Sequence, residues 1–173
     1  MRKHSTQAAR FEQIVAPHMN TLYKAAWRLV GKAEDAEDLV QQVLEKLYPQ
    51  TEKLETIENP GPWLKKVLYR EFVDNYRKRV RRPENYPAER EDALEHLREP
   101  EDNPETLVLR AENRQRVRQA LDNLDHDNRA LIVMHLAEGY TLAEMAEIFR
   151  VPAETLKTRL RRARARLKKI LLA

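Results

Sequence analysis

The C-terminal part of this sequence is rich in Lys and Arg, and the type and spacing of these residues suit the recognition of nucleic acid. The stretch from Lys157 to Lys169 contains eight basic residues and no acidic residue. On a helix with about 100° per residue its apolar residues form one stripe, and Lys157, Arg161 and Arg162 point broadly away from it. Such side chains can bind guanine O6 and N7 in a major groove or hold phosphates. A solvated basic face on a C-terminal helix is the plainer alternative.

A helix-turn-helix motif is expected to position these cations. Thr141 followed by Glu144 is a capping-box signature for a short helix that ends at Phe149. Residues 150–152 then form a tight turn into a final helix over residues 153–172. Two further helices are predicted before the motif, over residues 107–124 and, capped by Asp125, over residues 127–137.

A second group of cations lies on a predicted helix from Trp63 to about Arg82, which follows a loop over residues 50–62. Aromatic residues are interleaved with these cations, and rings beside cations suit unstacked bases on a charged backbone. As the alternative, Trp63 and Phe72 are simply core residues of the domain. The cations are Lys65, Lys66, Arg70, Arg77, Lys78, Arg79, Arg81 and Arg82.

The predicted helix over residues 35–48 combines an apolar stripe with a polar face. The apolar stripe consists of Ala36, Leu39, Val40, Val43, Leu44 and Leu47. The opposite face carries Asp38, Gln41, Gln42 and Glu45. Such a face is either solvated or a site for a partner protein.

The composition predicts an all-α fold of two small helical domains. Only three glycines and an abundance of Leu, Ala, Glu, Arg and Gln favour helix. The stretch from Pro83 to Glu105 holds four prolines and nine acidic residues, which cannot close a core of their own. Residues 83–106 are therefore predicted to be a flexible acidic linker between domains over 11–82 and 107–173. Residues 1–10 are predicted to be a disordered basic N-terminus.

No constellation for catalysis or for a cofactor is found in the sequence. It has no cysteine, its five histidines show no ligand-like spacing, and it lacks a Gly-rich phosphate loop and a nucleophile elbow. We therefore expect neither an enzyme nor a metal or other cofactor site. The polar start of the chain and the lack of a run of about 18 apolar residues predict a cytoplasmic protein without membrane insertion.

Three segments in this order and spacing resemble extracytoplasmic-function (group 4) sigma factors of the sigma-70 family. They are DAEDLVQQVLEKLY (35–48), PWLKKVLYREFVDNYRKRVRR (62–82) and YTLAEMAEIFRVPAETLKTRLRRARARLKKIL (140–171). The resemblance covers nearly the whole chain beyond residue 10. It implies sigma region 2 and a helix-turn-helix sigma region 4, and an alternative sigma factor that binds bacterial core RNA polymerase, recognises promoter DNA and starts transcription. Members of this family usually pair with an anti-sigma factor.

The resemblance also implies three sets of site residues. The polymerase-binding residues would be Asp35, Asp38, Leu39, Gln41, Gln42 and Glu45, on the coiled coil of the β′ subunit. The minus-ten residues would be Trp63, Lys65, Lys66, Arg70, Arg77, Lys78 and Arg79. The minus-thirty-five residues would be Thr155, Lys157, Thr158, Arg159, Arg161 and Arg162. The acidic linker would thread through polymerase and mimic the charge of nucleic acid.

The chain departs from the family pattern at two places. Arg70 and Glu71 stand where the family often carries Asn, so the family's minus-ten preference cannot be transferred. His126 and Asp127 stand where a Pro commonly opens a helix, which should change little.

Two competing interpretations remain open at this point. A stand-alone helix-turn-helix regulator would explain the C-terminal half of the chain, but not the polar face, the basic helix after Trp63 or the acidic linker. A protein that captures polymerase without reading DNA is the other alternative, and it predicts that neutralising the final helix has no effect.

Overall fold

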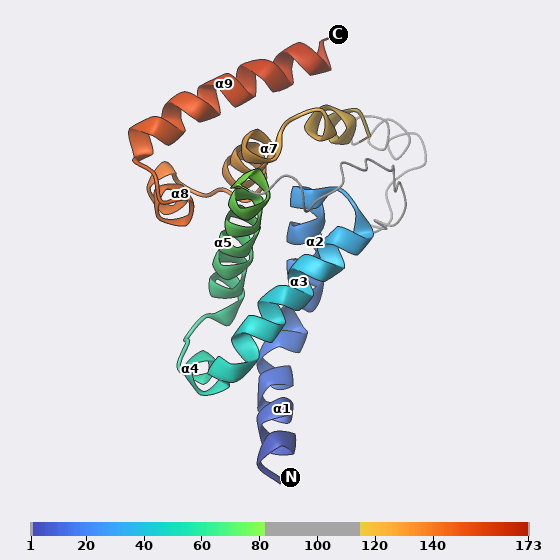
Figure 1. The fold of residues 1–173 in the computed structure, drawn as a ribbon, viewed down its shortest axis with the longest axis vertical. Coiled ribbons are helices and arrows are strands. Elements are labelled where there is room, and N and C mark those ends of the chain that lie inside the picture. Colours follow the sequence, from blue (N-terminus) through green and yellow to red (C-terminus); the bar gives the residue numbers. More distant parts are fainter. Residues whose placement is uncertain (1, 82–114, 173) are drawn as a thin grey trace, which may run out of the picture. The chain divides into compact units, whose positions relative to one another are not determined.

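The computed structural model describes residues 2–81 and 115–172, and all regular structure in these two ranges is helical. The chain divides into two compact units, residues 1–89 and 90–173 (Figure 1). This confirms the prediction of an all-α protein with two helical domains. The predicted linker over residues 83–106 and the first half of the predicted helix over 107–124 lie outside the described residues.

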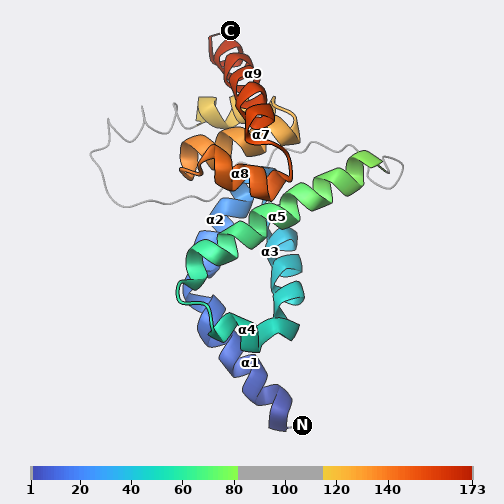
Figure 2. The same cartoon turned by 90° about the vertical axis from the view of Figure 1, so that its left-hand side faces the viewer.

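The first unit is built from five α-helices and two short 3-10 turns that link them. They are α1 (Arg2–Val15), η1 (Ala16–His18), α2 (Met19–Val30), α3 (Ala33–Leu47), η2 (Tyr48–Gln50), α4 (Thr51–Glu55) and α5 (Pro60–Arg81). Helix α5 packs across α2 and α3 (Figure 2), and the three helices enclose the core of this unit. Their fully buried residues include Leu22, Leu29, Val43, Leu64 and Leu68. The 3.6-residue spacing of these apolar residues is what places them on one face of each helix.

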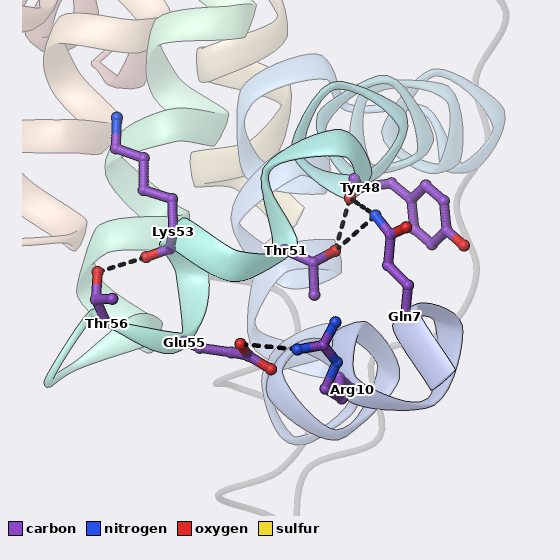
Figure 3. Close-up of polar contacts among 7 residues, drawn as sticks. All are labelled: Gln7, Arg10, Tyr48, Thr51, Lys53, Glu55 and Thr56. Atoms are coloured by element: carbon purple, nitrogen blue, oxygen red, sulfur yellow. Dashed lines mark hydrogen bonds and ion pairs between the residues drawn. The ribbon is translucent and has the colours of Figure 1, made fainter. Parts of the chain in front are cut away.

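Helix α1 corrects the expectation that residues 1–10 are disordered. The helix begins at Arg2, and two of its early side chains contact α4 and the turn before it (Figure 3). The Gln7 amide donates to the Tyr48 carbonyl at 2.9 Å, and Arg10 pairs with Glu55 at 3.2 Å. The ring of Phe11 meets the ring of Tyr48 edge to face, with centroids 5.3 Å apart. Polar residues near the start of the chain are therefore ordered by partners more than 40 residues away.

The predicted loop over residues 50–62 contains a helix of its own. Helix α4 occupies Thr51–Glu55, and Thr56 ends it by donating from its hydroxyl to the Lys53 carbonyl at 2.8 Å (Figure 3). Helix α5 then starts at Pro60, before the predicted start at Trp63. Proline suits this first helical position because its missing N–H would have no partner there.

The second unit, as far as it is described, consists of a helical stretch over residues 115–122 and four named elements. These are α7 (His126–Ile132), a π-helical segment η4 (Val133–Ala137), α8 (Leu142–Phe149) and α9 (Ala153–Leu171). As predicted, Asp125 caps α7, accepting from the Asn128 N–H at 2.9 Å. Helix α9 packs against both α7 and α8. Leu131, Met134, Met145, Phe149 and Leu156 form the centre of this core.

Candidate nucleic-acid interface

Helix α9 separates apolar and basic residues as the sequence predicts. Its N-terminal half buries Leu156, Leu160 and Ala163, each at most 4% exposed. Leu167, Ile170 and Leu171, the rest of the predicted stripe, are half-buried. All six predicted minus-thirty-five residues are exposed, namely Thr155, Lys157, Thr158, Arg159, Arg161 and Arg162. The helix therefore presents a cationic surface without disturbing its packing.

Two surface ion pairs modify the charge of this helix. Lys157 Nζ lies 3.7 Å from the carboxylate of Glu154, and both side chains are mainly exposed. Arg166 lies 3.6 Å from Asp125, the residue that caps α7. Exposed pairs of this kind contribute little to stability and are screened by salt. Lys157 is thus available to a stronger anionic partner, whereas Arg166 lies beside α7.

The helix-turn-helix geometry depends on local caps. The hydroxyl of Thr141 accepts from the Glu144 N–H at 3.2 Å, while Glu144 Oε2 accepts from the Thr141 N–H at 2.8 Å. This reciprocal capping box fixes the start of α8. Arg150 ends α8, and Pro152 caps α9 only two residues later. Because the connection is so short, it holds the N-terminus of α9 close to the end of α8.

A buried arginine that the sequence interpretation missed supports this unit. Arg129 is 6% exposed, and its guanidinium pairs with Asp122. Burial lowers the pKa of Arg118 from its usual value, the carboxylate of Asp122 opposes that shift, and the positive charge of Arg129 adds to it. Asp122 therefore offsets two neighbouring positive charges. The sequence offered no sign that Arg129 is buried, since it follows three polar residues at the start of α7.

Helix α5 presents its cations differently. Tyr69 and Phe72 are buried, so they belong to the core rather than to a base-stacking surface. Trp63 is half-buried, so part of the residue remains accessible. Among the predicted minus-ten residues, Arg70 and Lys78 are exposed and Lys65, Lys66 and Arg77 are half-buried, while the side chain of Arg79 lies outside the described residues.

The beginning of α5 is held by a close contact with η1. A Cβ on Gly61 would lie 3.1 Å from Cε1 and Nδ1 of the His18 ring. Glycine is the residue that allows this approach, because it has no side chain to meet the imidazole. The segment over residues 56–59 is therefore held at both ends. At one end α4 contacts α1 through the pair of Glu55 with Arg10, and at the other end α5 contacts η1.

Helix α3 exposes most of the polar face that the sequence predicts. Asp38, Gln41, Gln42 and Glu45 are exposed, and Asp35 is half-buried. Leu39, which the resemblance places among the partner-binding residues, is only 5% exposed and packs in the core. Its position on the apolar stripe of the helix, one turn before Val43, is the physical reason.

Two polar contacts join α3 to α5, and the sequence interpretation missed both. Lys46 Nζ lies 2.6 Å from Glu71 Oε2, and the Glu71 side chain is 11% exposed. The Asn75 amide donates to Gln42 Oε1 at 2.7 Å. In each helix the two partners are four residues apart, so both contacts lie on facing sides of the helices. Glu71, which departs from the resembled pattern, thus has a structural partner in this chain.

Within residues 2–81 and 115–172, no group of three or more His, Asp or Glu residues is arranged to hold a metal ion. In the same two ranges, none of the helices combines the length and apolarity needed to cross a bilayer.

Comparisons with known proteins match both units. A family model described as Sigma-70 region 2 matches residues 14–82, and one described as Sigma-70, region 4 matches residues 114–167, which is together more than half of the chain. An "ECF RNA polymerase sigma factor EcfG" of Rhodopseudomonas palustris is 30% identical over 143 residues, covering 83% of this chain and 75% of the relative. An "ECF RNA polymerase sigma factor SigE" of Mycolicibacterium smegmatis is 28% identical over 166 residues, and this chain spans 60% of its length.

A solved structure is similar over almost the whole chain. It is a co-crystal structure of the sigma factor RpoE in complex with the anti-sigma factor NepR from Bartonella quintana. The similarity covers 94% of this chain and 97% of the other, with 28% identity and a TM-score of 0.65.

Proposed function

The chain belongs to the sigma-70 family, in the group of extracytoplasmic-function RNA polymerase sigma factors, and from this premise we propose that it binds bacterial core RNA polymerase and directs it to promoters. It would act as a transcription initiation factor in the cytoplasm, where polymerase works, and not as an enzyme. The observation that carries the proposal is the helix-turn-helix of α8 and α9, which exposes cations along a face opposite its buried stripe.

We assign the N-terminal half of α9 to the upstream, minus-thirty-five element. The recognition helix of a helix-turn-helix enters the major groove with its N-terminal residues against the base edges. Lys157 and Arg161 are one helical turn apart and both exposed, so they can face the same stretch of groove. They are the residues that we expect to specify sequence. Lys168 and Lys169 lie near the other end of α9, and we expect them to contact backbone or solvent.

We assign the start of α5 to the minus-ten element. Trp63 is half-buried beside the short segment that precedes α5, and Lys65 and Lys66 follow it within one turn. An accessible ring next to cations can stack on an unpaired base whose phosphates the cations hold. Tyr69 and Phe72 have no part in this surface because they are buried.

We assign the exposed polar face of α3 to core polymerase. Asp38, Gln41 and Glu45 point away from the core of the first unit, and the Gln41 amide donates to Glu45 at 2.9 Å. Gln42 shares this face, although its side-chain oxygen is already engaged by Asn75. A hydrogen-bonded face loses less side-chain freedom on binding than a mobile one.

We further propose that an anti-sigma factor controls this protein. The support is the similarity to the sigma factor RpoE, which was solved in complex with the anti-sigma factor NepR.

Transcription from a randomised promoter library with added core polymerase tests the function. We expect enrichment of two short elements at a fixed spacing. Arg161→Ala should then relax preference at one position of the upstream element, at a cost of about 1–3 kcal/mol on the preferred base. The matched control Lys168→Ala should weaken all sequences alike. The reverse pattern would refute the assignment of this face of α9.

A second experiment tests the α3 site by measuring binding to core polymerase of the double variant Asp38→Arg with Gln42→Arg. We expect loss of core-polymerase binding with unchanged helicity, because both side chains are exposed. Unchanged affinity for core polymerase would remove the α3 site. Failure of the unaltered chain to bind core polymerase would favour a stand-alone helix-turn-helix regulator instead.

A further inference from the structure

Arg150, at the turn of the helix-turn-helix, has a backbone conformation that is unusual for its residue type. Its φ is 48° and its ψ is 45°, in the left-handed region. Among the described residues it is the only non-glycine with positive φ. The other two residues with positive φ are Gly31 and Gly139, so elsewhere the chain uses glycine for this conformation.

The backbone around Arg150 requires this conformation. The N–H of Arg150 donates to the carbonyl of Ala146, and the N–H of Val151 reaches the same carbonyl at 3.3 Å. The bond from the Val151 N–H, which reaches back five residues, is typical of a Schellman motif. In that motif the first residue after the helix is left-handed and is usually glycine. Any Cβ there lies close to the following carbonyl oxygen, which costs free energy. An arginine at this position therefore stands where glycine would be the less strained residue.

The place of Arg150 suggests what its side chain does. The residue is exposed and lies two positions before Pro152, the cap of α9. With about 3.8 Å between successive Cα atoms, its Cα lies within about 11 Å of the first residue of α9. Phosphates line both rims of a major groove about 12 Å wide, so a helix that enters N-terminus first brings the preceding turn to a rim.

We propose that Arg150 binds a phosphate of the promoter backbone at the rim of the groove that α9 enters, an inference that rests on the function proposed above. Charge at this end of α9 supports it. Glu154 pairs with Lys157 and offsets part of the charge of the first cation in the helix. A cation before the helix restores attraction for an anion, and the N-terminal N–H groups of α9 add to it.

The competing explanation is that Arg150 only stabilises the turn. The two explanations predict opposite results for Arg150→Gly in the full-length chain. If the arginine serves DNA, glycine should leave the melting temperature of the second unit unchanged or raise it, because strain is relieved. If the arginine serves the fold, glycine should lower that melting temperature.

The decisive measurement is promoter binding by holoenzyme over a range of salt concentrations. For Arg150→Gly we expect affinity to fall about tenfold at low salt, as for loss of one charge-assisted hydrogen bond. The slope of log K against log salt concentration should decrease in magnitude by about one. The loss should be equal for all single-base variants of the upstream element. Arg150→Lys keeps the charge and should retain most of the affinity.

Three outcomes overturn the inference: unchanged affinity, an unchanged salt slope, or a lower melting temperature for Arg150→Gly. Arg161→Ala in the same assay separates this failure from failure of the proposed function. If Arg161→Ala loses base preference while Arg150→Gly binds as the unaltered chain does, only the Arg150 contact is refuted. If the unaltered holoenzyme shows no promoter preference, the proposed function fails, and the Arg150 contact with it.

Discussion

Helices α5 and α9 are both rich in cations, yet they hold them in different ways. Along α9 the cations of the N-terminal half are exposed and lie opposite Leu156 and Leu160. Along α5 several cations are half-buried, and the helix also contributes Leu68 and Tyr69 to the core. An exposed cation of α9, on the surface that we assign to DNA, can therefore be replaced without disturbing the buried stripe. In α5, by contrast, several cations of the surface that we assign to DNA are themselves half-buried among the side chains of the unit.

The contacts of α5 with α3 extend this difference. Lys46 pairs with the nearly buried Glu71, and Asn75 donates to Gln42 on the polar face of α3. Changes on α5 can thus reach the face that we assign to polymerase. The ion pairs of α9, Lys157 with Glu154 and Arg166 with Asp125, lie on its surface and stay within the second unit.

The largest expected effect that tests this comparison is that of Leu68→Ala in α5. Leu68 is fully buried, so the change should lower the free energy of unfolding of the first unit by about 2–5 kcal/mol. The exposed neighbour Arg70→Ala should stay within about 0.5 kcal/mol of the unaltered chain. Chemical denaturation of the full chain measures both. Equal effects of the two variants would show that α5 does not combine core and surface as described.

An intermediate effect is expected for Lys46→Ala. The change removes the partner of Glu71, whose side chain is only 11% exposed, and should cost about 1–3 kcal/mol. Adding Glu71→Gln to Lys46→Ala should recover part of the loss, because a neutral amide is less costly to bury than a carboxylate. A double-mutant cycle with both single variants gives the coupling between the residues. A coupling energy of zero would remove this link between α3 and α5.

The smallest expected effect concerns pH and the second unit. Burial, followed by the charges of Glu138 and Glu144, raises the pKa of Tyr140 to about 12 from its usual 10.0. The unfolded chain would ionise this phenol first, so the stability linked to it is fully present below pH 10 and is lost as pH rises from 10 towards 12. Tyr140→Phe should make thermal unfolding of the second unit less sensitive to pH in this window. An identical pH profile for both chains would contradict the assignment.

Local signals explain why the helix-turn-helix could be predicted from the sequence almost residue by residue. The capping box of Thr141 and Glu144 and the short turn before Pro152 depend on residues adjacent in sequence. The stripe of α9 follows from the 3.6-residue period, and so does the polar face of α3. For Leu39 the two sources differ, since the period predicts the buried position that the structure has and the family resemblance predicts a partner contact.

The features that could not be predicted depend on contacts between distant residues. Gln7 and Arg10 give no sign in the sequence that partners near residues 48 and 55 will order them. The pair of Lys46 and Glu71 depends on where two helices cross, which composition and spacing do not specify. Arg129 is buried beside Asp122 on the preceding helical stretch, and the sequence does not indicate that the two side chains meet.

The π-helical segment η4 marks a place where the chain could lose one residue and keep its helix. Its hydrogen bond from the Glu138 N–H to the Val133 carbonyl spans five residues, one more than in an α-helix. The segment therefore holds one residue in excess of a regular continuation of α7, and Leu136, 54% exposed, is a residue in it that contributes little to the core. In terms of insertions and deletions, a chain shortened by Leu136 can continue α7 as a regular α-helix up to Gly139. We therefore expect a chain shortened by one residue at this place to keep the packing of α8 against α9.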